Sequence, residues 1–511
     1  MTLNIPRQSR QNTSKDLVHL ACRPATDNLR GRVAIGAAWQ FGLVGSRIAF
    51  TILSTAILAR LLTPNDYGLN GMASIVVELA ALLTNMGFSS ILIQRRRVCR
   101  IHLDSVYWAS LGIGLALFSV VVILSIPASW FFKQPELIGI LCASATTLIL
   151  REAAVVPYAI LNRLLLFKAD ALLQFTALTV RILSAITLAW LGAGYWSLVL
   201  APVISALFEV VAATIYVGYK PRLRFSRHFF STTWRQSGSY LGSSILYYLL
   251  SNFDNMVVAR RFGAIQLGYY QTAYSLPEEL RNRFAHPIIR VLFPAYSLLQ
   301  GDLSAFRSAV DRSQRMLAAL VLPLGTGLAV TAEYVVHVLY GEKWLPIVPL
   351  LQILAVGGGT RAMFSLVGSI FSAKGHPELA FRVAIGSIPF TLPVIFIASF
   401  WGTEGVAWAM LLAQIPAIVG TYLAMRLIEA SPWSFYKAVL PASLASLIMA
   451  VSLLTADRWH WFGAMGYGQK LAAMICCGAA IYIAALCSLS KKSAQDFIGA
   501  FQTLTNRSSN K

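Results

Sequence analysis

A segment near the middle of the chain carries many ionisable side chains in an otherwise apolar context. It runs from Leu267 to Gln300 and is interrupted by three prolines. In an α-helix, Glu279, Arg283, His286 and Arg290 would follow the spacing i, i+4, i+7, i+11 and share one face. Such a face cannot contact acyl chains unless its charges are solvated or paired. The spacing predicts either that it lines a water-filled cavity, which we favour, or that pairs such as Glu279 with Arg283 neutralise it.

Single arginines also stand near the middle of three other apolar runs, at Arg47, Arg181 and Arg361. A guanidinium group binds a phosphate or a carboxylate through two parallel hydrogen bonds, which lysine cannot do. The alternative is a permanent ion pair with a carboxylate of another helix, for which Glu78, Glu152, Glu209, Asp254 and Glu333 are candidates. With the arginines of the polar segment, the predicted substrate-binding set is Arg47, Arg181, Arg281, Arg283, Arg290 and Arg361.

Amides and carboxylates within the apolar runs are candidates for binding a coupling ion. Asn252 and Asp254 stand together in one run, and an intramembrane carboxylate beside an amide could bind a proton or Na⁺. A hydrogen-bond cluster between packed helices is the alternative. The predicted ion-coupling set is Asp254, Asn252, Glu78 and Glu278. Gly357-Gly358-Gly359 lacks the lysine of a phosphate-binding loop, so we interpret it as close helix packing or a flexible point.

The composition shows which solvent surrounds these groups. Of the 511 residues, 57% are hydrophobic and only 12% are charged, with a mean hydropathy of +0.64. No soluble interior could bury this much apolar surface. Apolar runs of about 20 residues recur about fourteen times, each long enough to cross a bilayer. All are predicted to be helices, because an unclosed backbone in lipid must satisfy its own hydrogen bonds.

The net charge of +21 reflects topology. Basic clusters, such as Arg95-Arg96-Arg97 and the stretch from Lys220 to Arg235, fall between alternate spans, as the positive-inside rule requires. Both termini are therefore predicted to be cytoplasmic, and the clusters to contact membrane lipids and not nucleic acid. Tryptophans including Trp130, Trp344 and Trp401 fall at the opposite span ends, where aromatic rings prefer the interface.

The sequence shows no signature of catalysis or of a bound cofactor. Its six cysteines form no CxxC pair and have no histidine at metal-ligand spacing. The predicted outer loops are too short for a catalytic domain. We therefore expect no enzyme activity, no metal and no cofactor beyond a coupling H⁺ or Na⁺.

The spans form two sets with the same layout. Gly42, Ala59, Arg60 and Glu78 recur at a constant offset as Gly242, Ala259, Arg260 and Glu278. An even number of spans in each half predicts parallel halves, related by an axis along the membrane normal. The predicted fold is an all-α polytopic membrane protein with two parallel six-helix lobes around a central cavity, plus a C-terminal helix pair. The predicted parts are a disordered cytoplasmic tail (1–32), an N-terminal lobe (33–218), a basic linker (219–234), a C-terminal lobe (235–428) and an accessory helix pair with a tail (429–511).

Several motifs resemble those of a known transporter family. They are Ile57-Leu-Ala-Arg-Leu-Leu-Thr-Pro-Asn-Asp-Tyr-Gly68, Gly87 with Leu92-Ile-Gln-Arg95, Asn252-Phe-Asp254, Gly268-Tyr-Tyr270 and Phe293-Pro294-Ala295. Over roughly residues 33–430 the chain resembles a Wzx-type polysaccharide flippase, of the polysaccharide transporter branch of the multidrug/oligosaccharidyl-lipid/polysaccharide exporter superfamily. The motifs are characteristic of this branch and not of one substrate.

This resemblance implies a secondary transporter that moves an undecaprenyl-diphosphate-linked oligosaccharide across the bacterial inner membrane. Surface polysaccharide assembly would then supply its partners, a polymerase and export machinery. A drug or cation antiporter of the same superfamily is the alternative among transporters. A membrane-embedded glycan polymerase or ligase is the alternative of another class, and it would need catalytic residues on a sizeable outer loop.

Overall fold

The computed structural model describes residues 17–18, 47, 50–84, 92–93, 95, 98–226, 245–461, 465–492 and 495–496, except for the side chains of Arg290 and Val291. Over these residues the regular structure is helical, and no strand occurs among them. The all-α prediction is therefore confirmed for this part of the chain. Two compact units are present: Met1–Asn252 with Gly263–Ile265, and Phe253–Phe262 with Gln266–Lys511. The predicted 1–32 tail lies almost wholly outside the described residues.

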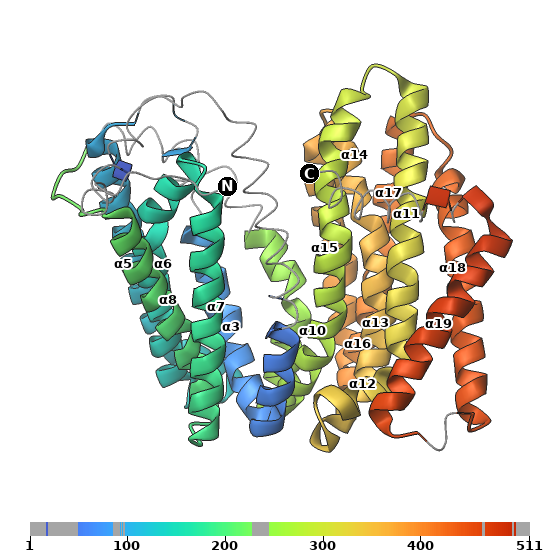
Figure 1. The fold of residues 1–511 in the computed structure, drawn as a ribbon, viewed down its shortest axis with the longest axis horizontal. Helices are drawn as coiled ribbons and strands as arrows, with labels where there is room; N and C mark the ends of the chain where they lie inside the picture. The colour runs from blue at the N-terminus through green and yellow to red at the C-terminus, as the bar shows by residue number, and fades with distance from the viewer. Residues whose placement is uncertain are drawn as a thin grey trace, which may run out of the picture. The chain divides into compact units, whose positions relative to one another are not determined.

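The first unit is a bundle of long apolar helices (Figure 1). After a short helix, Phe50–Leu61, it contains α3 (Pro64–Thr84), α5 (Arg100–Phe132), α6 (Leu137–Arg163), α7 (Phe167–Trp190) and α8 (Trp196–Val217). At 1.5 Å per residue the long helices exceed the ~30 Å thickness of a hydrocarbon core. Helix α6 is central, because it packs against α3, α5, α7 and α8.

The segment that follows α8, residues 219–226, is hydrogen-bonded to the start of α5. Gly218 ends the helix with a left-handed backbone (φ 66°), a conformation that glycine adopts without steric cost. The buried Asp104 carboxylate then accepts hydrogen bonds from the Tyr219 hydroxyl (2.8 Å) and the Arg222 amide (3.3 Å). The Trp108 indole donates to the Arg222 carbonyl (2.9 Å). Only residues 219–226 of the predicted 219–234 linker are described.

The second unit begins with a helix that is broken by one glycine. Element α10 (Phe253–Leu298) has a non-helical backbone at Gly263, where φ is 81°, so it consists of two helical segments. The break lies between the apolar run that contains Asp254 and the polar segment that begins at Leu267, which the sequence indicated as separate. The second segment stays helical through Pro277, Pro287 and Pro294.

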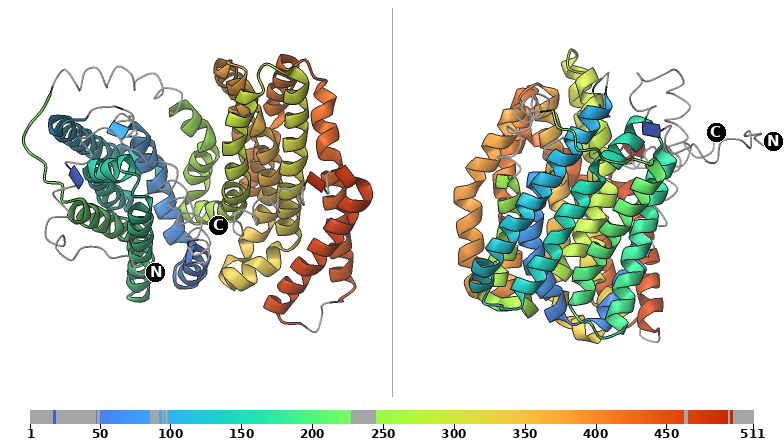
Figure 2. Two further views of the ribbon diagram at one scale, coloured as in Figure 1. Left: turned by 45° about the horizontal axis from the view of Figure 1, so that its top comes forward. Right: turned by 90° about the vertical axis from the view of Figure 1, so that its left-hand side faces the viewer.

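The remaining helices of the second unit form a helical bundle (Figures 1 and 2). The unit contains α11 (Leu303–Val330), α12 (Ala332–Leu339), α13 (Val348–Phe364), α14 (Leu366–Ala373), α15 (Pro377–Ala398), α16 (Gly402–Leu412), α17 (Ile415–Leu427), α18 (Pro432–Arg458) and α19 (Tyr467–Leu489), with short 3-10 turns at Glu342–Ile347 and Ser399–Trp401. The pair α18 and α19 lies at the edge of the unit and contacts α11.

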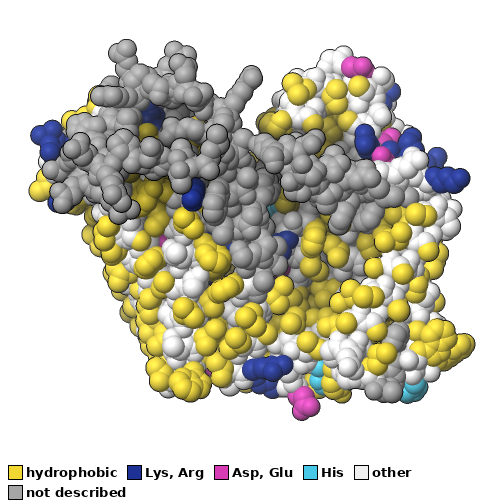
Figure 3. Space-filling model, in the orientation of Figure 1, with side chains coloured by type: hydrophobic (Ala, Val, Ile, Leu, Met, Phe, Trp, Pro, Cys, Tyr) yellow, Lys and Arg dark blue, Asp and Glu magenta, His cyan; other side chains and the backbone are white. Residues whose placement is uncertain are grey.

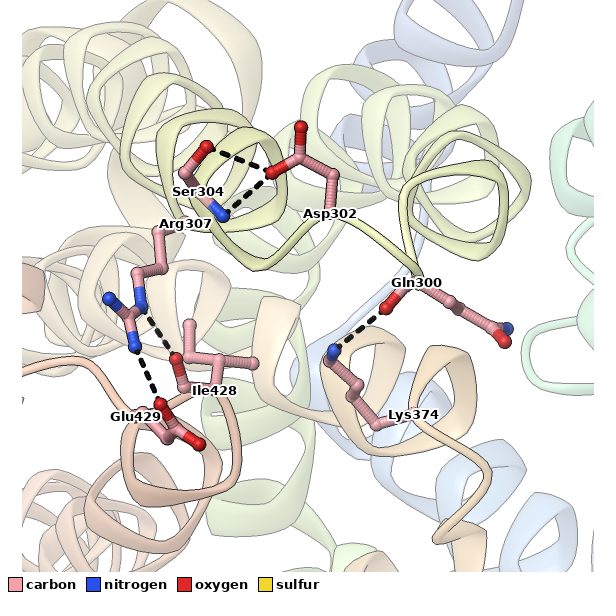
Figure 4. Close-up of polar contacts among 7 residues, drawn as sticks. All are labelled: Gln300, Asp302, Ser304, Arg307, Lys374, Ile428 and Glu429. Atoms are coloured by element: carbon pink, nitrogen blue, oxygen red, sulfur yellow. Dashed lines mark hydrogen bonds and ion pairs between the residues drawn. The ribbon is translucent and has the colours of Figure 1, made fainter.

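Polar contacts fix the loops at one end of the second unit (Figure 4). Arg307 donates to the Ile428 carbonyl at 2.7 Å and pairs with Glu429 at 3.3 Å. The Asp302 carboxylate caps α11 by accepting from the Ser304 amide and hydroxyl. The Ala305 amide also donates to this carboxylate at 3.0 Å, and it and Ser304 lower the pKa of the exposed Asp302 carboxyl, because their hydrogen bonds favour its charged form.

The described helices include ten that are long and apolar enough to cross a membrane. Hydrophobic side chains cover the flanks of the second unit on the face drawn in Figure 3, and charged ones gather near one of its ends. The chain is therefore a multi-pass membrane protein. The prediction of about fourteen spans and the predicted lobe boundaries stay predictions.

Helix packing explains Gly358, the middle residue of the triple glycine, and the burial of Trp344. A Cβ added to Gly358 would lie 3.0 Å from the Pro277 side chain, whereas one added to Gly357 or Gly359 would make ordinary contacts at 3.5 Å, so Gly358 is the glycine that close packing favours. The prediction for Trp344 was wrong. Its side chain is fully buried against Tyr269 and Tyr340, whereas Trp401 is 73% exposed, as expected for an interface residue.

Candidate functional site

A cavity of about 440 Å³ lies within the first unit. Most of its polar lining comes from three helices: Tyr158 from α6, Gln174 and Arg181 from α7, and Glu209 from α8. Gln174 and Arg181 are seven residues apart and therefore share one face of α7. Arg47, Leu178 and Ser205 complete the lining. The structure thus brings together Arg47 and Arg181, two of the predicted substrate-binding residues.

One side-chain amide oxygen and one backbone carbonyl oxygen accept hydrogen bonds from Arg47 in this cavity. Its guanidinium group lies 3.3 Å from the Gln174 side-chain oxygen and 3.5 Å from the Ala171 carbonyl oxygen. Gln174 in turn donates to the buried Asp170 carboxylate at 2.9 Å. A permanent ion pair was the alternative for Arg47, and no carboxylate of the described residues lies within 4.0 Å of its guanidinium group.

Arg151 and Arg181 both attract the Glu209 carboxylate electrostatically but form no ion pair with it. Among the described residues, no ion pair within 4.0 Å involves any of the three. The sequence analysis missed Arg151, although it stands inside an apolar run as Arg181 does, and treated Glu209 only as a pairing partner. Arg151 and Glu209 could have been identified by the criterion that identified Arg181, a charged residue near the middle of an apolar run.

Two polar atoms of the residues that line this cavity have no partner within the described chain. The buried Tyr158 hydroxyl and the Arg47 Nε make no hydrogen bond there. A buried polar atom without a partner costs about 1–3 kcal/mol, so water or a ligand is expected to satisfy it. The cavity therefore offers guanidinium, amide and hydroxyl groups to an anionic or hydroxyl-rich ligand.

The polar segment of α10 is largely neutralised internally. Arg281 pairs with Glu278, and Arg283 pairs with Glu279 at 2.8 Å. The pairing that the sequence analysis offered as the alternative therefore occurs. The Arg283 side chain remains 20% exposed and that of Glu279 54%. The side chain of Arg290 lies outside the described residues.

The third lone arginine belongs to a buried network of the second unit. The Arg361 guanidinium group donates to the Tyr274 hydroxyl. The Tyr270 and Tyr274 rings stack, with centroids 6.4 Å apart, and the Tyr270 hydroxyl donates to Asp254 at 2.8 Å. A small cavity of about 10 Å³, enough for about one water molecule, is lined in part by Tyr274, Glu278 and Arg361.

The predicted ion-coupling residues fall into two groups. In the first unit, Tyr248 donates to the Ile75 carbonyl (3.0 Å) and lies 3.5 Å from the Glu78 carboxylate, while its own carbonyl accepts from Asn252 (3.1 Å). In the second unit, Asp254 and Glu278 both neighbour the tyrosine network. The Oδ1 atom of Asp254 has no partner within the described chain. Among the described residues no cluster of three His, Cys, Asp or Glu suits a metal ion.

Solved structures and curated proteins resemble this chain over most of its length. It superposes with a TM-score of 0.68 on a structure described as lipid II flippase MurJ in an inward closed conformation, at 17% identity, covering 88% of this chain and 98% of that one. It is 26% identical to the lipopolysaccharide biosynthesis protein WzxC of Escherichia coli, covering 78% of this chain and 82% of the relative. It is 25% identical to the succinoglycan biosynthesis transport protein ExoT of Rhizobium meliloti, covering 78% and 81%.

The structural likeness shows that the chain has the fold of this flippase. A family model described as polysaccharide biosynthesis protein matches residues 57–349, which is more than half of the chain. This match and the motifs at its start, between Ile57 and Gly68, show that the chain belongs to the polysaccharide biosynthesis protein family.

Proposed function

We propose that this protein flips oligosaccharide repeat units linked to undecaprenyl diphosphate across the bacterial inner membrane. The observation that carries the proposal is the cavity of the first unit, in which Arg47 and Arg181 face a polar space inside a membrane-spanning bundle. Membership of the polysaccharide biosynthesis family and the name of the transport relative support it. The product would feed exopolysaccharide or another surface polysaccharide.

The chemistry of the cavity fits the two polar parts of this substrate. Guanidinium groups bind diphosphate oxygens in a two-pronged geometry. Gln174, Tyr158 and Ser205 offer partners for sugar hydroxyls. The antiporter alternative is less well supported, because the cavity lining holds two arginines, Arg47 and Arg181, against one carboxylate, Glu209, and would repel a cation.

Transport would proceed by alternating access, with no chemistry on the substrate. A proton or Na⁺ gradient would drive it, with Asp254, Asn252, Glu78 and Glu278 as candidate coupling residues. Both termini would lie in the cytoplasm, and a polymerase and the export machinery would receive the product. Arg281, Arg283 and Arg361 would contribute to substrate binding when their present partners exchange for the diphosphate.

A complementation experiment tests the role of the cavity. Arg47→Gln and Arg181→Gln are introduced into a strain that lacks its own copy, and surface polysaccharide and inner-leaflet lipid-linked oligosaccharide are measured. Loss of one charge-assisted hydrogen bond costs about 1.5–3 kcal/mol, so export should fall roughly ten-fold or more while the lipid-linked precursor accumulates.

Arg426→Gln is the matched control, because Arg426 is an exposed arginine of α17 that does not line the cavity. It should leave export unchanged. Normal export from both cavity variants, at normal protein levels in the membrane, would refute the proposed site. Increased drug sensitivity without a polysaccharide defect would instead support the antiporter.

A further inference from the structure

We propose that Glu209 is a built-in counter-anion that the substrate diphosphate displaces, so that substrate binding and protonation of Glu209 are coupled. This inference rests on the proposed function and adds a coupling residue to it. Glu209 is absent from the ion-coupling set that the sequence suggested.

The geometry of the first unit places Glu209 where a diphosphate must compete with it. Glu209 and Arg181 line the same cavity from neighbouring helices, α8 and α7. Arg151 and Arg181 both attract the carboxylate and repel one another. None of the three makes an ion pair within 4.0 Å to the described chain, so the Arg181 guanidinium group, which lines the cavity, keeps its hydrogen-bonding capacity for a ligand.

Among the other titratable groups on the helices packed against α8, Tyr158 also interacts electrostatically with Glu209, whereas Asp170, Glu152 and Glu78 have other neighbours. On α7, Asp170 accepts from Gln174. On α6, Glu152 is buried with its side chain next to Gly114 of α5, and Tyr158 faces the cavity. On α3, Glu78 interacts with Tyr248 and feels the charge of Arg151.

Arg47 is held by oxygens of α7 and supplies a third positive charge. Glu209 is therefore the one carboxylate among the residues that line this cavity. An anion that enters the cavity meets its negative charge directly.

Displacement changes the charge that surrounds Glu209. In the empty cavity, burial disfavours the charged carboxylate, and the positive charges of Arg151 and Arg181 favour it. A diphosphate that hydrogen-bonds to Arg181, which lines the same cavity, takes up its positive charge and adds its own negative charge beside Glu209. The carboxylate then accepts a proton from water, because the neutral form avoids the like charge. Linkage is reciprocal, so a protonated Glu209 must raise the affinity for the anion by the same factor.

Proton counting on the full-length protein in nanodiscs of neutral lipid tests this coupling. Inorganic pyrophosphate is the probe, and calorimetry in two buffers of different ionisation enthalpy gives the protons taken up on binding. Pyrophosphate itself titrates, so the quantity of interest is the difference between wild type and Glu209→Gln at one pH. The variant should take up fewer protons and, above neutral pH, should bind roughly ten-fold more tightly, within the usual range of coupling between two sites.

Glu404→Gln is the control, since Glu404 is an exposed carboxylate of α16 in the second unit. It should reproduce the wild-type affinity and proton uptake. The inference is overturned if Glu209→Gln binds pyrophosphate with wild-type affinity and proton uptake, or if only Glu78→Gln abolishes the uptake. In either case, loss of binding in Arg181→Gln would leave the proposed function intact. Absence of pyrophosphate binding to the wild type would overturn both.

Discussion

Asp254 and Tyr270 are joined by a hydrogen bond across the break in α10. The Tyr270 hydroxyl donates to Asp254 Oδ2 at 2.8 Å, and Gly263, which ends the first helical segment, lies between the two residues in sequence. Both side chains are buried, with at most 1% of their surface exposed. This bond therefore links the two segments of α10 in a place that water does not reach.

Removing the donor should destabilise the second unit. Tyr270→Phe leaves the buried Asp254 carboxyl without its tyrosine partner, which costs about 1–3 kcal/mol. The variant should melt earlier than wild type, as followed by tryptophan fluorescence in detergent. Tyr436→Phe is the control, because the buried Tyr436 hydroxyl has no partner within the described chain. Equal melting temperatures for Tyr270→Phe and wild type would show that the bond contributes nothing.

Two glycines of α11 should respond in opposite ways to alanine. A Cβ on Gly325 would lie 2.7 Å from the Ala355 carbonyl oxygen of α13, so the helices must separate, at about 1–3 kcal/mol. A Cβ on Gly327 would meet only Met449, at 3.7 Å. Gly327→Ala should be neutral or stabilising by up to about 1 kcal/mol, since alanine favours the helix. Thermal melting of the pair measures this difference, and a Gly325→Ala variant as stable as Gly327→Ala would contradict the close packing.

The segment after α8, residues 219–226, should become more sensitive to protease when the hydrogen bond between Tyr219 and Asp104 is removed. Tyr219→Phe removes the hydrogen bond to the buried Asp104, while Arg222 and Arg224 remain exposed as trypsin sites. Cleavage in inverted membrane vesicles should be faster for the variant than for wild type, because local opening costs less. Cleavage in right-side-out vesicles only would instead place this segment outside the cytoplasm and refute the predicted topology.

Lysine should not replace Arg181. Arg181→Lys keeps the charge but loses the planar pair of donors, so at least one charge-assisted hydrogen bond to a diphosphate is lost. That loss corresponds to about 1.5 kcal/mol, or roughly ten-fold in affinity. Surface polysaccharide output should fall, and Arg426→Lys should leave it unchanged. Full activity of Arg181→Lys would mean that a point charge is enough at this position.

The sequence by itself determined that the protein lies in a lipid bilayer and that its fold is helical. Composition and the length of the apolar runs require a helical membrane protein, because backbone groups in lipid must bond within their own helix. Local spacing also predicted contacts within one helix, such as Glu279 with Arg283, since residues four apart are neighbours there. The motif around Ile57 to Gly68 indicated the family that the comparison showed.

Only the tertiary structure decided which lone arginines share a cavity. Arg47, Arg181 and Arg361 are all single arginines near the middle of apolar runs. The first two line one cavity, whereas Arg361 donates a hydrogen bond to the Tyr274 hydroxyl. Trp344 looked like an interface residue and is buried. The physical reason is that a helix's own periodicity defines its faces, whereas the rotation of each helix within a bundle is set by side-chain packing with helices distant in sequence.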